Sequence, residues 1–222
     1  MKMRYLSSTA RPARLILAIS LILFAGACNQ SLALKVESEI PIPLVSKLPV
    51  DMGVFYAEDF KNHVYTENTE TRPDWAIESG PSQVALFDQV LPSMFRSVKH
   101  LNTLPSAAPD AEVNAILVPE IEEMQFSLPR ETRLDMYEVW IKYKIRFLEN
   151  DGELIAEFPL TAYGKTTTEF LKNREEGLNG AMELALRDAG AKMAIGFPET
   201  NEVKQWLAAN IEECTGEPGG PC

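Results

Sequence analysis

Apolar and polar side chains alternate most clearly between residues 137 and 147. Every odd position in this stretch is apolar or aromatic, and most even positions carry a charge. Side chains in a strand point to opposite faces in turn, so the pattern predicts a half-buried antiparallel strand with Trp140 on its solvent side. The following Asn150-Asp151-Gly152 fits a tight turn, and residues 154–163 alternate again. The sequence therefore predicts a long antiparallel hairpin.

Two longer segments show the three- and four-residue spacing of amphipathic helices. The first runs from Ser82 to Lys99 and contains Pro92, which should kink the helix. The second runs from Gly177 to Phe197, and a short final helix is expected from Asn201 to Ile211. Packing against a sheet is the simplest interpretation of both apolar stripes.

Two further strands complete the predicted domain, at residues 50–56 and 111–128. A polar stretch from Glu58 to Ser79 is expected to be a long connection, and such connections are often functional. The order β-α-β-β-β-α predicts an α+β fold, a mainly antiparallel sheet with two main helices packed on one face. Residues 49–210 would form this single domain.

The first 28 residues follow a different pattern. Four basic residues precede an apolar run of about ten residues, Leu15–Phe24, which is too short to span a bilayer alone. Small residues at 25–27 and Cys28 follow, and they resemble the lipobox of a bacterial lipoprotein signal peptide. The resemblance implies that residues 1–27 are removed and that the Cys28 thiol takes up a diacylglyceryl group. The alternative is an uncleaved membrane anchor, or an ordinary signal peptide cut near Ala27.

Lipidation at Cys28 would hold the protein on a membrane, because two or more acyl chains anchor firmly where one is marginal. Asn29 follows the cysteine, and under the sorting rule of enterobacterial lipoproteins this implies the outer membrane, with the protein facing the periplasm. Residues 28–48 contain Pro41 and Pro43 and are predicted to be an extended tether.

Charge narrows the choice of partner. The chain has 21 basic and 32 acidic residues, a net charge of −11. Because residues 1–27 contain four basic residues and no acidic one, the remainder carries −15. A binder of phosphate groups needs a basic surface, so nucleic acid is not an expected partner.

Two more cysteines stand near the end of the chain. Cys214 and Cys222 flank a stretch rich in Gly and Pro, within the tail 211–222 that we expect to be flexible. In an oxidising periplasm they would either form a disulfide that closes a small loop or remain two free thiols.

Catalytic and metal-binding signatures are not found in the sequence. His63 and His100 are far apart, and no nucleophile elbow, phosphate-binding loop or Cys-x-x-Cys is present. The cluster Glu120, Glu122 and Glu123 does not have the spacing of a calcium loop, and Arg187 with Asp188 fits a surface pair. We therefore expect no enzymatic activity, no cofactor and no metal.

One surface feature is a candidate for partner contact. Lys142, Lys144 and Arg146 form a basic row on the solvent side of the strand at residues 137–147, beside Trp140. Such a row would suit an acidic partner or a lipid headgroup. The alternative is that the row pairs across strands, for example with Glu157, or is covered by another element.

The lipobox, the element order, the turn Asn150-Asp151-Gly152-Glu153 and the helix around residues 185–191 resemble small envelope lipoproteins of Gram-negative bacteria. These include auxiliary lipoproteins of ABC-type lipid transport systems, the LPS-assembly lipoprotein LptE and relatives of the TolB amino-terminal domain. The resemblance implies a non-enzymatic binding or scaffold module that supports an envelope transport or assembly complex. The alternatives are a lipid-carrying module and a cell-wall hydrolase.

Overall fold

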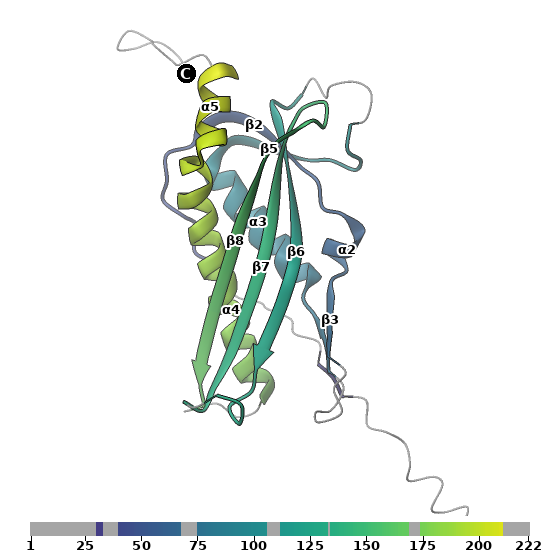
Figure 1. Ribbon diagram of the computed structural model, residues 1–222, viewed down its shortest axis with the longest axis vertical. Helices are drawn as coiled ribbons and strands as arrows, with labels where there is room; N and C mark the ends of the chain where they lie inside the picture. The colour runs from purple at the N-terminus through teal and green to yellow at the C-terminus, as the bar shows by residue number, and fades with distance from the viewer. Residues whose placement is uncertain are drawn as a thin grey trace, which may run out of the picture.

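The main body is a five-stranded mixed sheet with helices on one of its faces (Figure 1). The computed structural model describes residues 30–32, 40–67, 75–105, 112–132, 134–168 and 174–210. The strand order is β5-β2-β6-β7-β8. The strands are β2 (Leu48–Val54), β5 (Phe95–His100), β6 (Ala115–Ser127), β7 (Met136–Glu149) and β8 (Leu154–Thr167).

The hairpin predicted at residues 137–163 is confirmed as the β7-β8 pair, extended by β6 into an antiparallel meander. The odd positions of β7 from Tyr137 to Phe147 are buried, whereas Trp140 is 45% exposed. Gly152 closes the turn with φ of 95°, a conformation that glycine adopts without strain. The two-residue period is thus reproduced in the burial of alternate side chains.

Both main helices pack on one face of this sheet, as predicted. They are α3 (Gly80–Met94) and α4 (Arg174–Gly196), and a 3-10 turn η1 (Phe197–Glu199) leads into α5 (Asn201–Asn210). Large side chains fill the space between the layers. They include Tyr143, Phe95, Phe147, Phe197, Met52, Leu86, Leu91 and Met94. The fold is α+β, and these side chains are fully buried between its layers.

The predicted helix from Ser82 to Lys99 is wrong beyond Met94. The chain leaves the helix there and forms β5, which pairs in parallel with β2. Phe95 and Val98 suit a helical stripe and a strand equally well, so the local pattern does not separate the two structures. Pairing with Leu48 and Met52 of β2 decides the outcome.

The expectation of an irregular connection from Glu58 to Ser79 is also wrong. This stretch contains α2 (Glu58–Lys61), β3 (Val64–Glu67) and β4 (Trp75–Glu78). Together with β1 (Gln30–Leu32) the last two make a small second sheet of order β1-β4-β3. Buried Phe60 and Ile77 join this region to the main core, which the polar composition of the stretch conceals.

Part of the predicted tether is packed on the domain. Ile40 is only 4% exposed, and its backbone N–H donates a hydrogen bond to Gln89 Oε1 at 3.2 Å. Ile42 and Leu44, in contrast, are exposed. After the buried Ile40, the segment that contains Pro41 and Pro43 therefore runs along the surface of the domain.

Several predictions fall on residues outside the described ranges. The signal peptide, the lipidation site Cys28, and both Cys214 and Cys222 in the tail are among them. Within the described part of the chain, no helix is long and apolar enough to cross a membrane.

Candidate binding face of the sheet

The side of β6, β7 and β8 that faces away from α3 and α4 is the candidate site (Figure 1). It carries the polar positions of the alternating pattern. Near the β7-β8 turn this face is covered, because Val113, Ile116, Val118 and Leu148 form a small second core with Leu101 and Leu104. The open region lies toward the other end of the strands, around Trp140.

Trp140 rests on a second aromatic ring. Its ring centroid lies 4.2 Å from that of Tyr163, its cross-strand neighbour in β8, with 37° between the planes. The Tyr163 hydroxyl donates a hydrogen bond to Glu138 Oε1 at 2.8 Å. Burial, followed by the nearby Glu138 carboxylate, raises the pKa of Tyr163 to about 12, so the phenol stays neutral and remains a donor. These contacts fix a large exposed ring in one orientation.

The basic row of β7 is paired with carboxylates of β6. Lys142 Nζ lies 2.9 Å from Glu122 Oε2, while Lys144 Nζ and Arg146 Nε lie 3.3 Å and 2.6 Å from the two Glu120 oxygens. The hydrogen bond from Lys142 lowers the pKa of the Glu122 carboxyl. Cross-strand pairing therefore occurs, but with β6 and not with Glu157 of β8. The row does not present three free positive charges.

A shallow pocket of about 200 Å³ opens beside Trp140. Its lining residues are Glu123, Gln125, Trp140, Ile141, Lys142 and Thr161. Two of the four predicted contact residues, Trp140 and Lys142, thus meet in one pocket, whereas Lys144 and Arg146 lie farther along β7 against Glu120. Gln125 and Thr161 come from the adjoining strands, opposite Trp140 and Lys142 respectively. Sequence reasoning missed them because only the strand register brings them there.

The outer edge of β8 is occupied by α4. The backbone N–H of Tyr163 donates to Asp188 Oδ2 at 2.9 Å, and Lys192 Nζ donates to the Thr161 carbonyl oxygen at 2.8 Å. Pro159, two residues before Thr161, has no N–H to offer. An edge strand normally presents unpaired groups to a partner strand, and here helical side chains satisfy them. Strand addition at this part of β8 is therefore blocked.

An apolar groove of about 490 Å³ lies next to this edge, between β8 and the last turns of α4. Phe158 and Leu160 line it from the strand, and Ala191 and Ile195 from the helix. Ile195 is 67% exposed, so the groove is open to solvent.

The remaining candidate residues have structural partners. His63 Nδ1 lies 2.7 Å from Ser79 Oγ, and His100 Nε2 lies 3.1 Å from Asp88 Oδ1. Arg187 pairs with Glu183 one turn earlier in α4. Among the described residues, no group of three or more acidic, histidine or cysteine side chains could hold a metal ion.

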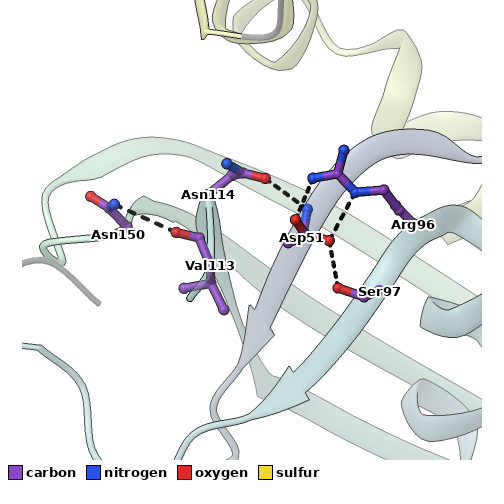
Figure 2. Close-up of polar contacts among 6 residues, drawn as sticks. All are labelled: Asp51, Arg96, Ser97, Val113, Asn114 and Asn150. Carbon is purple, nitrogen blue, oxygen red and sulfur yellow. Dashed lines mark hydrogen bonds and ion pairs between the residues drawn. The ribbon is translucent and has the colours of Figure 1, made fainter. Parts of the chain in front are cut away.

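A polar network joins β2, β5 and Asn114, the residue just before β6, at the β5 edge of the sheet (Figure 2). Asp51 of β2 accepts two hydrogen bonds from the Arg96 guanidinium and one of 2.6 Å from Ser97 Oγ, both from β5. Its backbone N–H donates to Asn114 Oδ1 at 2.8 Å, and the N–H of Asn114 returns a bond to the Asp51 carbonyl at 2.7 Å. The network spans the irregular register of β2 and stabilises its parallel pairings.

Comparison with known proteins gives a likeness in structure only. No family model and no curated protein matches the sequence. A solved structure from Xanthomonas campestris, with family model DUF330, superimposes with a TM-score of 0.52 at 12% identity and covers 79% of this chain and 98% of its own. A minor lipoprotein from Acinetobacter baumannii gives 0.35 at 12% identity, covering 73% and 96%. Uncharacterized lipoprotein B from Nitrosomonas europaea gives 0.35 at 13%, covering 77% and 94%. The chain therefore shares the fold of the Xanthomonas protein.

Proposed function

We propose that this protein is a lipid-anchored periplasmic binding or scaffold protein of the outer membrane that supports an envelope transport or assembly complex. The observation that carries the proposal is the open face of β6, β7 and β8, on which Trp140 is fixed by Tyr163 yet exposed. Large exposed aromatic side chains held rigidly are the residues that most often anchor a binding partner. The resemblance of the residues before Cys28 to a lipobox supports the anchoring part of the proposal.

Recognition on this face would depend on shape and hydrogen bonding more than on net charge. The cations of β7 are already paired with Glu120 and Glu122, so an acidic partner would have to compete with these carboxylates. The exposed part of the Trp140 ring, in contrast, is available for contact with a partner.

Lipid carriage is a second candidate, favoured by the apolar groove between β8 and α4. Its volume of about 490 Å³ falls in the range of roughly 300–1,000 Å³ that small-molecule sites occupy. Native mass spectrometry of protein extracted from membranes would show a bound lipid, and Ile195→Asp should remove it. A Leu154→Asp control, at an exposed position elsewhere on β8, should retain the lipid.

The anchor is tested by metabolic labelling with radioactive palmitate. Wild-type protein and Cys214→Ala should incorporate the label, whereas Cys28→Ala should not. Labelling of Cys28→Ala would refute lipidation at this position.

The scaffold role is tested by crosslinking in intact envelopes followed by affinity purification of the full chain. We expect one membrane complex with the wild-type protein and much less of it with Cys28→Ala or Trp140→Ala. Recovery of the same complex with all three proteins would contradict both the anchor and the binding face.

A further inference from the structure

We propose that the pocket beside Trp140 binds a neutral sugar ring of an envelope glycan. The inference rests on the proposed function, since it names the class of partner that the open face would take. It depends on the aromatic wall of the pocket, on the pairing of its charges and on its size.

The aromatic wall is rigid and partly uncovered. Trp140 cannot turn away freely because Tyr163 lies 4.2 Å behind it and is itself held by Glu138. An aromatic ring has an apolar surface with a negative face and suits a ligand with polarised C–H groups on one side. Sugar rings have such a side, and their hydroxyl groups point outward around it.

The polar lining offers both donors and acceptors around that wall. Glu123 supplies carboxylate oxygens, Lys142 supplies ammonium hydrogens, and the hydroxyl of Thr161 can do either. The Gln125 amide donates to Glu123 Oε1 and leaves its carbonyl oxygen as an acceptor. A sugar hydroxyl both donates and accepts, so it can use groups of either kind.

Charge pairing disfavours an anionic ligand. Glu122 and Lys142 form an ion pair, and Glu123 stands directly opposite the same lysine in the strand register. The lining therefore carries no uncompensated positive charge that would attract a phosphate or carboxylate. A neutral sugar ring can bind without breaking the ion pair between Glu122 and Lys142.

A β-bulge creates this arrangement. In the pairing of β6 with β7, Ile121 lies opposite Tyr143 and Glu123 opposite Lys142, so Glu122 is the extra residue. Bulges redirect side chains, and this one lets Glu122 bind Lys142 while Glu123 lines the pocket. Two consecutive glutamates thus lie next to Lys142, Glu122 as its ion-pair partner and Glu123 as its cross-strand neighbour.

Size limits the ligand to a single ring. The pocket volume of about 200 Å³ is below the roughly 300–1,000 Å³ of sites that enclose drug-sized ligands. An extended glycan could place one residue against Trp140 while the rest of the chain remains outside.

The experiment measures binding to soluble glycans by isothermal titration calorimetry and binding to insoluble sacculi by sedimentation. The full-length protein is kept in dimethyldodecylamine oxide, because this detergent has no sugar headgroup. The probes are chitotetraose, purified peptidoglycan sacculi in a sedimentation format, and lipopolysaccharide core oligosaccharide freed of lipid A. The last two separate the two envelope sources of sugar.

We expect saturable binding of at least one probe, and affinity reduced at least tenfold by Trp140→Ala. Trp140→Phe keeps an aromatic wall and should lose less, while Gln125→Leu should lose severalfold through its missing amide. Leu154→Ala, at an exposed position of β8 away from the pocket, should bind as the wild type does. Circular dichroism confirms that each variant is folded.

The proposal is overturned if no probe binds, or if Trp140→Ala binds as tightly as the wild type. Binding confined to the core oligosaccharide, which carries phosphate and carboxylate groups, and lost at high salt would also overturn it, in favour of an anionic ligand. Any of these results together with an intact crosslinked complex would leave the scaffold role in place.

Discussion

The backbone of Gly164 in β8 lies directly against the carbonyl oxygen of Ala181 in α4. A Cβ atom at Gly164 would overlap this oxygen and the backbone nitrogen of Ala185. Glycine therefore sets the distance at which the long helix packs on the sheet.

Gly164→Ala should destabilise the fold strongly. Overpacking commonly costs about 1–3 kcal/mol, and backbone atoms cannot rotate away, so we expect about 3 kcal/mol or more, equivalent to a melting temperature lower by roughly 6–12 °C. Gly180→Ala is the control, because the nearest atoms to its Cβ would belong to the Thr166 side chain, the first of them at 3.1 Å. It should change the stability by no more than about 1 kcal/mol. Equal effects in thermal unfolding would contradict the close approach.

Tyr143→Phe should destabilise the core through the partner that it leaves behind. The buried Tyr143 hydroxyl of β7 donates a hydrogen bond to Gln83 Oε1 of α3, and burial raises the pKa of this phenol. Its loss leaves the buried Gln83 Oε1 without this donor, which costs about 1–3 kcal/mol. The double variant Tyr143→Phe with Gln83→Met should recover part of this loss, as measured by urea unfolding. Strictly additive effects would show that the two side chains are not coupled.

Asp51→Asn should lower the melting temperature by about 2–4 °C near neutral pH. Hydrogen bonds from Arg96 and then Ser97 hold the pKa of Asp51 below its ordinary 3.8. A group with a lowered folded-state pKa stabilises the fold above its unfolded pKa and loses this effect as the pH falls through the folded value. The difference between wild type and variant should therefore be complete at pH 7 and shrink below about pH 4.

The control for Asp51→Asn is Glu199→Gln, which removes an exposed carboxylate that pairs with Lys204. It should change the melting temperature little at any pH. If the difference in melting temperature between wild type and Asp51→Asn stayed constant down to pH 2, the loss of the charged Asp51 network would be ruled out as its cause.

Asp188→Ala should open the edge of β8. The change removes the acceptor of the Tyr163 N–H and the partner of Lys192, so hydrogen exchange at the Tyr163 amide should become faster. We expect a loss of about 1–2 kcal/mol and more self-association, because an unpaired strand edge can accept another strand. Glu183→Ala, which breaks only the ion pair with Arg187, should cost about 0.5 kcal/mol or less. Unchanged exchange at Tyr163 would refute the role of Asp188.

Elements with a strong local period were predictable from the sequence. The β7-β8 hairpin and the helix α4 follow directly from the spacing of their apolar residues. Strand β5 was not predictable, because Phe95 and Val98 fit the period of a helix and that of a strand equally well. Only pairing with β2, more than forty residues earlier, decides between the two structures. Long-range pairing of this kind leaves little trace in a short window of sequence.

The candidate site was also predictable only in part. Trp140 and Lys142 follow from the alternation in β7, which places them on the solvent face. Tyr163 and Gln125 become their neighbours through the register of three strands, and the neutralisation of Lys142 depends on the bulge at Glu122. None of these relations is local in the sequence.

The pairing of β1 with β4 would determine how high the domain stands above the bilayer. Gln30 lies opposite Trp75, and Asn29 alone separates it from Cys28. Consecutive Cα atoms are about 3.8 Å apart, so a lipidated Cys28 would hold Gln30, the first residue of the small sheet, within about 8 Å of its anchor. Tyr65 of that sheet contacts Phe126 of β6 with ring centroids 5.2 Å apart, next to Gln125 at the pocket. Extra residues before Gln30 would raise the pocket away from the membrane, whereas extra residues after Leu32 would leave its height unchanged.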